Sequence, residues 1–559
     1  MGHKFYGDMH IDDGVGKIYG YVTAGLKDGE VAGSKATIEG ENNIASGSTA
    51  HAEGSGCQAI GDTSHAEGRN TKANGSCSHA SGNETEAYGN AAFSCGVSTI
   101  ADGEASFVGG KNAGAFGNGS VAFGYGDVNT LDKIDATTLN NYITFVNNKS
   151  QLPSESDIEQ MKNIYQEIQK KIDYDNSSTA LGESSFSVGR YSLAIGHGSV
   201  AFSGKAIGMY SFAFGSGEVY GASSLAFGSG VTIYGYQSIG LGAYHEITGQ
   251  SSFSVGNGHT ITGDMSSALC GHNTITGDKC FVVGGDNKIT GDLSSVGGGK
   301  SNIIEGDESF AIGYYSRIYG DNSFCAGRQT IAIANEFVIG YANKQSTTPQ
   351  AFVIGGAENA SQRANAFRVT FNGDVYCAGK YNTVGADYAE YFEWKDKNIN
   401  QEDRRCYFVT LIDDKITIAS SNDYILGIVS TTASVCGNNP EDWSGRYIKD
   451  EFGTILTEEI EYEDIETDPN TGKEISIIKT GVFHKQNPNY DSTKPYVERN
   501  KRPEWAAIGM LGVLHVRDDG TCQVNGYCKV ADGGIATTAN NGYRVIARTG
   551  PNVIKIIFK

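Results

Sequence analysis

Short runs in which apolar and small residues alternate dominate the chain as far as residue 343. Runs such as SVAFG, SFAFG, SSLAFG, SFSVG and SFAIG would place successive side chains on two opposite faces, as strands do. Most runs end on a glycine, and these glycines return every fourteen residues: Gly54, Gly68, Gly82, Gly96, Gly110 and Gly124. A short fixed period predicts stacked coils that are each too small to bury a core alone. The pattern therefore predicts a mainly β protein built on a β-solenoid, here a β-roll with fourteen-residue repeats.

A second set of glycines lies seven residues out of phase with the first: Gly47, Gly61, Gly75, Gly89, Gly103 and Gly117. After an interruption the ladder returns from Gly221 to Gly291, slips by one residue at Gly306 and resumes at Gly320. In the TITGD and KITGD turns a glycine precedes aspartate, which suits a turn with positive φ at the glycine. Because one coil supplies only a few apolar side chains, we expect three chains to wind together into a homotrimer and share a core.

The same patterns divide the chain into six regions. We predict an N-terminal cap or attachment region, two stretches of β-roll repeats separated by a helical insertion, neck strands, and a mixed, mostly β globular domain: residues 1–40, 41–126, 127–180, 181–343, 344–384 and 385–559. All three tryptophans follow residue 390, so the last region differs in composition from the rod.

The insertion is predicted to hold two helices. Its second part carries Ile158, Met161, Ile164, Tyr165 and Ile168 at helical spacing, with Ser154 or Ser156 as N-cap. In a trimer the helices would form a six-helix collar, and as a lone hairpin they would form a lateral binding knob. We favour the collar.

The charge and cysteine content narrow the classes of partner. A formal net charge of −21 argues against nucleic acid and anionic membranes. The first residues have no apolar signal region, and no run reaches membrane-spanning length, so we expect production in the cytoplasm without export. The eleven cysteines have no zinc spacing, and Cys95, Cys270 and Cys325 replace apolar residues of the repeat, so we expect reduced core thiols. Neither a metal nor another cofactor is expected.

Three histidines occupy one slot in successive coils. His51, His65 and His79 stand where later coils carry Phe93, Phe107 and Val121, so we expect this slot to point inward, with Glu53 and Glu67 two residues further on pointing the same way. Buried His and Glu must be paired. The favoured interpretation is a structural layer of interchain His–Glu hydrogen bonds, and the alternative is a metal or anion on a three-fold axis.

A pair of carboxylates opens the last region. Gly385-Ala386-Asp387-Tyr388-Ala389-Glu390 places Asp387 and Glu390 three residues apart, and such a pair can divide acid and base roles if its environment separates the two pKa values. Taken alone, such pairs are more often solvated surface. Arg404 and Arg405 could stabilise an oxyanion or pair with carboxylates.

Two parts of the chain resemble known families. The rod resembles the head repeats of trimeric autotransporter adhesins, whose SVAIG-type runs build a trimeric left-handed β-roll. From GADYAEYFEW through RPEWAAIGMLGVLHVRDDG to GYRVIARTG, the last region resembles the self-cleaving domain of phage preneck appendage and tail-spike proteins, an intramolecular chaperone classed with glutamic peptidases. That resemblance implies a domain that promotes trimerisation and cuts once between Ala386 and Asp387, with Asp387 and Glu390 catalytic. The family's known case has serine before the cut, whereas this chain has Ala386, so a serine hydroxyl cannot be essential here.

Together these inferences predict a phage fibre or appendage protein, assembled in the host cytoplasm and carried on the virion. It would contact other virion proteins through its N-terminal region and a host-surface receptor, expected to be a glycan, with no nucleic acid or membrane partner. We expect single-turnover self-cleavage and no turnover of an external substrate. The alternatives are a polysaccharide-depolymerising tail spike and a bacterial surface adhesin or injection-system fibre.

Overall fold

The computed structural model describes residues 4–6, 9–12, 15–18, 21–125, 141, 143–145, 147–148, 155–172, 178–440, 443, 445–467 and 474–559. The chain forms two compact units, Met1–Gly379 and Lys380–Lys559. No helix in the described part of the chain has the length and apolar character that a membrane crossing needs.

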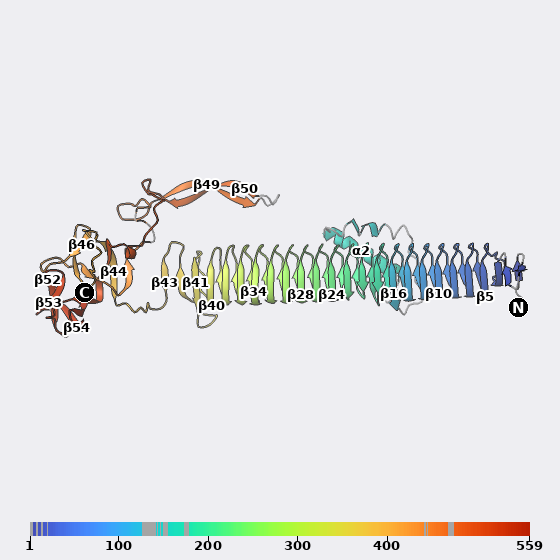
Figure 1. Ribbon diagram of the computed structural model, residues 1–559, viewed down its shortest axis with the longest axis horizontal. Coiled ribbons are helices and arrows are strands. Elements are labelled where there is room, and N and C mark those ends of the chain that lie inside the picture. Colours follow the sequence, from blue (N-terminus) through green and yellow to red (C-terminus); the bar gives the residue numbers. More distant parts are fainter. Residues whose placement is uncertain are drawn as a thin grey trace. The chain divides into compact units, whose positions relative to one another are not determined.

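The first unit is a β-solenoid in which most coils contribute a longer and a shorter strand (Figure 1). Longer strands stack in parallel on longer strands and shorter on shorter, so that His51 pairs with His65 and Gln58 with Lys72, one repeat apart. This confirms the solenoid predicted from the glycine interval. The longer strands are β5 (Thr37–Ala45), β6 (His51–Ser55), β8 (His65–Arg69), β10 (His79–Asn83), β12 (Phe93–Val97), β14 (Phe107–Lys111), β16 (Val121–Tyr125), β18 (Phe186–Val188), β20 (Val200–Phe202), β22 (Phe212–Gly215), β24 (Leu225–Ser229), β26 (Ile239–Ala243), β28 (Phe253–Asn257), β30 (Ser267–Gly271), β32 (Phe281–Gly285), β34 (Ser295–Lys300), β36 (Phe310–Tyr314), β38 (Phe324–Arg328), β40 (Phe337–Tyr341) and β41 (Phe352–Gly356).

The shorter strands are β7 (Gln58–Ala59), β9 (Lys72–Ala73), β11 (Glu86–Ala87), β13 (Ile100–Ala101), β15 (Ala113–Ala115), β17 (Ser178–Ala180), β19 (Ser192–Ala194), β21 (Lys205–Ala206), β23 (Glu218–Val219), β25 (Thr232–Ile233), β27 (Glu246–Ile247), β29 (Thr260–Ile261), β31 (Thr274–Ile275), β33 (Lys288–Ile289), β35 (Ile303–Ile304), β37 (Arg317–Ile318) and β39 (Ile331–Ala332). Ahead of the coils, β1 (Lys4–Tyr6) pairs with β4 (Tyr21–Leu26), and β2 (Met9–Asp12) pairs with β3 (Val15–Ile18). After them, β42 (Asn365–Val369) and β43 (Val375–Cys377) add antiparallel strands, joined by a turn in which Gly373 has φ 86°.

Each coil has a thin core of its own. The second residue of a longer strand and the last of a shorter one are fully buried, as at Ala52 and Ala59, or Val282 and Ile289. The residues on either side of the buried position in the longer strand face away from this core. Within one chain, therefore, the buried side chains form a narrow core along the rod. The side chains on the opposite face of the longer strands are left uncovered.

The glycines of the TITGD turns are required for the close stacking of coils and not for a left-handed backbone conformation, so the predicted positive φ is wrong. Gly263, Gly277 and Gly291 are not among the residues with positive φ, whereas Met265, just after the aspartate, has φ 52°. A Cβ on Gly263 would lie 1.9 Å from the carbonyl oxygen of Gly277. Glycine is required because the next coil occupies the space of a side chain.

The interruption between β16 and β17 carries helix α2 (Glu155–Ile172), which lies against the solenoid (Figure 1). Its Met161 and Ile164 are buried in a cluster with Phe116, Leu193 and Ile195 of the coils. Ser156 lies inside the helix and so is not its N-cap. The proposed cap Ser154 and the side chains of Ile158, Tyr165 and Ile168 lie outside the described residues, while positions 141, 143–145 and 147–148 are also helical.

The cysteines are free thiols, but their predicted burial is only partly correct. Cys325 is buried, whereas Cys95 is half-buried and Cys270 is exposed. Cys270 pairs with Gly256 and Gly284 of the adjacent coils and has φ 87°, so it occupies a glycine slot at the coil's surface and not an apolar slot.

The second unit is mostly β. Its ten-stranded sheet runs β46-β45-β47-β51-β55-β54-β52-β53, with β44 paired to β48 and β51. The strands are β44 (Asp387–Glu393), β45 (Phe408–Ile412), β46 (Lys415–Ile418), β47 (Gly427–Val429), β48 (Ala433–Gly437), β51 (Trp505–Arg517), β52 (Tyr527–Ala531), β53 (Ile535–Ala539), β54 (Tyr543–Gly550) and β55 (Val553–Phe558). A separate antiparallel hairpin, β49 (Thr457–Thr467) and β50 (Glu474–His484), and the 3₁₀ turn Arg499–Lys501 complete it.

Candidate active site

The segment with the paired carboxylates begins strand β44. This strand lies between β48, to which it runs parallel, and β51, to which it runs antiparallel. Asp387 pairs with Ala433 on one side and with Gly512 on the other. The bond between Ala386 and Asp387 therefore enters the sheet at a point where both neighbouring strands hold the backbone.

The Ala386 peptide units are fixed by two backbone hydrogen bonds. The Ala386 N–H donates to the carbonyl oxygen of Thr432 at 3.1 Å, and the Val513 N–H donates to the Ala386 carbonyl oxygen at 3.2 Å. Gly512 permits this approach, because a Cβ at that position would lie 2.3 Å from the Ala386 oxygen. A backbone donor thus already points at the carbonyl that an attack on this bond would convert to an oxyanion.

The Asp387 carboxylate lies inside the unit, with the residue 3% exposed. The Thr432 hydroxyl donates to its Oδ1 at 3.2 Å, and its Oδ2 has no hydrogen-bond partner among the described residues. That oxygen lies against Gly509, where a Cβ would be 2.7 Å away. An under-bonded buried carboxylate beside an exposed Ala386 is costly to maintain, which marks it as a candidate for chemistry.

The Asp387 carboxylate influences the pKa of two neighbouring titratable groups. Burial, followed by the Lys555 ammonium, lowers the pKa of His515, and the Asp387 carboxylate opposes this shift. Burial raises the pKa of the Cys436 thiol, and Asp387 raises it further. The environment around Asp387 thus favours neutral neighbours.

Glu390 lies on the other face of the strand from Asp387. Asp387 and Ala389 are buried, whereas Tyr388 is exposed and Glu390 is half-buried, as alternation along a strand requires. Glu390 accepts a 2.6 Å hydrogen bond from the Tyr388 hydroxyl, which is the largest cause of the raised pKa of Tyr388. The structure therefore does not bring the two predicted catalytic carboxylates together within one chain.

Arg404 and Arg405 have carboxylate partners elsewhere. Arg404 pairs with Asp396 at 2.6 Å and with Glu402 at 2.8 Å, and its hydrogen bonds lower the pKa of Asp396 to about 2. Arg405 pairs with Asp403 at 2.8 Å. Within the described ranges no hydrogen bond or ion pair joins either arginine to Asp387 or Glu390, so one chain gives no support to a role at the oxyanion.

The histidine slot points away from the chain's own core. Ala52 and Ala66 fill that core, while the neighbouring His51 and His65 are about one third exposed. Glu53 and Glu67 share their face. The predicted inward direction is therefore wrong for a single coil, because alternation gives the core to the intervening alanines.

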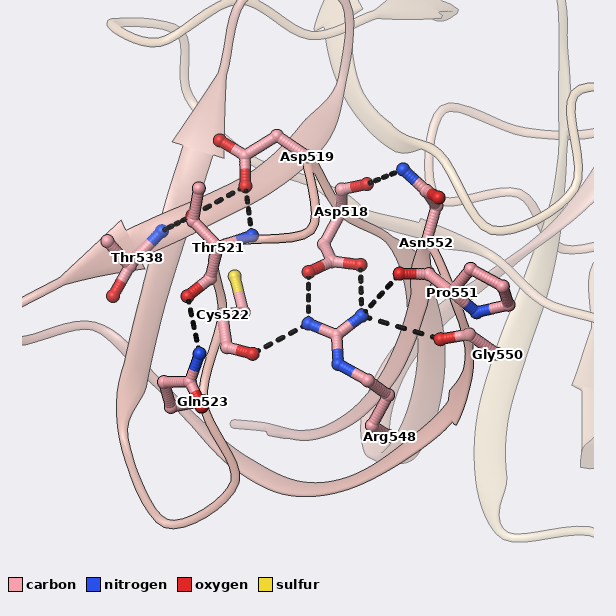
Figure 2. Close-up of polar contacts among 10 residues, drawn as sticks. All are labelled: Asp518, Asp519, Thr521, Cys522, Gln523, Thr538, Arg548, Gly550, Pro551 and Asn552. Atoms are coloured by element: carbon pink, nitrogen blue, oxygen red, sulfur yellow. Dashed lines mark hydrogen bonds and ion pairs between the residues drawn. The ribbon is translucent and has the colours of Figure 1, made fainter.

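A third cluster, of two carboxylates and a thiol, already contains an arginine bound to one of the carboxylates. Asp518, Asp519 and Cys522 offer atoms within 4.8 Å of one another. Figure 2 shows that Arg548 donates to both carboxylate oxygens of Asp518, at 3.0 and 2.6 Å, and to the Cys522 carbonyl at 2.6 Å. The cluster is therefore a structural clamp between the end of β51 and the β54–β55 region.

Sequence reasoning missed the groups that surround the Ala386–Asp387 bond. Thr432, Val513 and His515 lie far along the chain from Asp387 and carry no motif. Only the glycines at 509 and 512, within the GMLGVLH run, give a signal in the sequence, since glycine in a strand marks a close approach of another backbone.

Comparison with known families assigns this region. Residues 336–552 match the model of Peptidase_G2, the IMC autoproteolytic cleavage domain. The match begins within the last coils of the rod and covers nearly the whole second unit.

The curated relatives include proteins of Bacillus phages. The chain is 33% identical over 184 residues to the pre-neck appendage protein of Bacillus phage B103 (31% of this chain, 19% of that protein) and 37% identical over 160 residues to the preneck appendage protein of Bacillus phage PZA (28% and 16%). The matches thus span less than a quarter of these relatives' length.

The crystal structure of the C-terminal fragment of bacteriophage phi29 gene product 12 is 31% identical, with 31% of this chain and all of that one covered and a TM-score of 0.24. The carboxy-terminal part of this chain is therefore similar to the IMC autoproteolytic cleavage domain of Peptidase_G2 and to preneck appendage proteins of Bacillus phages.

Proposed function

We propose that this chain is a fibre or appendage protein of a phage particle, that it assembles as a homotrimer with the help of its last domain, and that this domain cuts the chain once between Ala386 and Asp387. The rod would then contact the host surface. The similarity to the autoproteolytic cleavage domain carries the proposal, because the relatives matched in sequence are appendage proteins of phages.

The uncovered face of the rod supports self-association. Phenylalanines that flank the buried position of the longer strands are exposed along the rod, with Phe227 at 56%, Phe281 at 43% and Phe337 at 43%. Soluble proteins rarely leave a continuous apolar stripe open. A partner that matches the repeat over the length of the rod is best supplied by another copy of the same rod, and three copies would close the stripe around an axis.

The contacts of the Ala386–Asp387 peptide support hydrolysis of that bond. Water would add its oxygen to the Ala386 carbonyl carbon, the bond to the Asp387 nitrogen would break, and that nitrogen would take up a proton. The Val513 N–H, already 3.2 Å from the Ala386 oxygen, would stabilise the negative charge that develops there. The buried Asp387 carboxylate stands beside the leaving nitrogen as a group that can exchange the proton.

The position of Glu390 favours a division of the site between chains. It lies on the face opposite Asp387, so its carboxylate does not share the buried surroundings of that residue at the start of the strand. We assign Glu390 as general base for the bond of a neighbouring copy, which makes cutting conditional on assembly. The chemistry is then glutamic-peptidase-like and limited to one turnover, since each chain holds a single such bond.

Intact mass under denaturing conditions tests the cut. The purified wild-type chain should give two fragments that meet at Ala386 and Asp387, whereas Glu390→Gln should remain a single species of 559 residues. Tyr388→Phe, which removes only the hydroxyl bonded to Glu390, is the matched control and should still cut. An uncut wild-type chain, or a cut Glu390→Gln chain, would contradict the assignment.

Co-expression of two differently tagged chains tests the division between copies. One chain carries Glu390→Gln, and the other carries Asp387→Ala, which removes the carboxylate proposed to serve its own bond but keeps Glu390. Cutting of the Glu390→Gln chain only in the mixture is the expected result. No cutting in mixed trimers verified by tandem purification would mean that Glu390 serves its own chain or none.

A further inference from the structure

The histidine ladder has nitrogen atoms for which the described part of the chain offers no hydrogen-bond partner. The rings of His51, His65 and His79 stack with centroids 4.6 Å apart. The Nε2 atom of each is inaccessible and has no hydrogen-bond partner among the described residues. Buried ring nitrogens without partners are uncommon in proteins, so their arrangement favours a ligand at the ladder.

A second histidine pair in the same rod shows the satisfied alternative. His245 and His259 also stack, with centroids 5.0 Å apart. Their Nε2 atoms lie 3.1 Å from the carbonyl oxygens of Leu241 and Val255, and their Nδ1 atoms accept from backbone N–H groups of the next coil. The rod can thus bury histidines with both nitrogens bonded, and the ladder at His65 does not follow that pattern.

Glu67 lies between two of the unsatisfied nitrogens. Its carboxylate oxygens are 4.0 Å from Nε2 of His65 and 3.6 Å from Nε2 of His79, which is beyond hydrogen-bond distance. A tetrahedral ion with ligand bonds of about 2.1 Å separates its ligand atoms by about 3.4 Å. The gap therefore suits an ion after shifts of about half an ångström, whereas direct hydrogen bonds would need a larger closure.

The geometry points to a site for one divalent transition-metal ion of the zinc class, held by His65, Glu67 and His79 of a single chain, with water as the fourth ligand. The Ser81 hydroxyl donates to Glu67 at 2.6 Å and orients the carboxylate, as groups behind metal ligands commonly do.

The neighbouring coils supply variants that keep the fold. Phe93 occupies the slot of His79 in the next coil, so His79→Phe extends the aromatic column and removes one ligand. Glu67→Gln keeps the shape of the second ligand. Asn273 follows His259 in its column and makes the same backbone bonds, so His259→Asn is the matched control that removes a histidine away from the site.

The test measures metal content in the full, untagged chain produced with added Zn²⁺ and dialysed. Mass spectrometry of the metal should find one Zn²⁺ per chain in the wild type and in His259→Asn, and none in His79→Phe or Glu67→Gln. Ser81→Ala should weaken binding by about 10- to 100-fold. Chain loaded with Co²⁺ should show the visible absorbance of a tetrahedral site, which the two ligand variants lose.

No metal in the wild type, or equal metal in His79→Phe and the wild type, would overturn the proposal. One ion per three chains would also overturn it, because that ratio places the ion on an axis between copies. These outcomes are independent of self-cleavage, since all the variants lie in the rod.

Discussion

Replacement of Gly263 by alanine should destabilise the rod strongly, although the change adds a single methyl group. The new Cβ would lie 1.9 Å from the Gly277 oxygen and 2.5 Å from the Gly277 carbonyl carbon. Ordinary contact requires about 3.2 Å or more, so the two turns must separate by more than about 1 Å. Both atoms belong to backbone, and no rotation of a side chain can relieve the contact.

The magnitude follows from the bonds between these turns. Four hydrogen bonds of 2.8 to 3.0 Å join them: Thr262 N to Ile275 O, Asp264 N to Asp278 Oδ1, Lys279 N to Asp264 O, and Ser266 Oγ to Gly277 O. A separation of about 1 Å exceeds hydrogen-bond distance for most of them. With about 1 kcal/mol net for each bond, loss of three costs about 3 kcal/mol.

Gly271→Ala is the control for this prediction. Gly271 has no positive φ, and a Cβ there would meet its nearest atom, the Asn257 oxygen, at 3.8 Å. It should therefore change the free energy of unfolding by about 1 kcal/mol or less. Guanidinium unfolding followed by circular dichroism, with hydrogen exchange at the Thr262 amide, compares the two variants. Equal destabilisation by both would refute the role of stacking and leave backbone entropy as the explanation.

Two further predictions concern the cleavage site and pH. Gly512→Ala would place a Cβ 2.3 Å from the Ala386 oxygen and should slow fragment formation about 100-fold in a gel time course. The control Gly550→Ala, whose Cβ would meet its nearest atom at 3.7 Å, should cut at the normal rate. Equal rates for the two variants would contradict the role of the close contact between Gly512 and Ala386. Burial lowers the pKa of His245 and His259 below 6.5, so these histidines bind protons more readily in the unfolded chain than in the folded one. The stability that the two histidines contribute is therefore present above about pH 6.5 and is lost as the pH falls below that value. The double variant His245→Asn, His259→Asn should lose less stability between pH 7.5 and 5 than the wild type in denaturant unfolding, and parallel losses would show that these histidines do not set the pH dependence.

The solenoid could be predicted because its cause is periodic in the sequence. A repeat of fourteen residues gives the length of one coil directly, and alternation along each run indicates which side chains share a face of the strand. The reason for each glycine could not be predicted in the same way. The interval of Gly263 and Gly277 is the same whether glycine serves φ or close stacking, and only the position of the neighbouring carbonyl distinguishes the two.

The candidate site was less accessible to sequence reasoning, since it depends on strand geometry and on distant partners. Asp387 and Glu390 are three residues apart, which would bring them to one side of a helix but separates them on a strand. Thr432 and Val513 reach the Ala386 unit because β44 lies between β48 and β51. That arrangement involves pairings across more than a hundred residues, and no local pattern encodes them.

One cause, alternation along a strand, leaves both the rod and the site incomplete in a single chain. In the rod it buries Ala52 or Val282 and turns the flanking His51 or Phe281 outward. In β44 it buries Asp387 and turns Glu390 outward. The proposed trimer and the proposed role of Glu390 across chains are therefore linked. A chain that is monomeric by sedimentation and still cuts itself would refute both, because its Glu390 would face away from the only bond available to it.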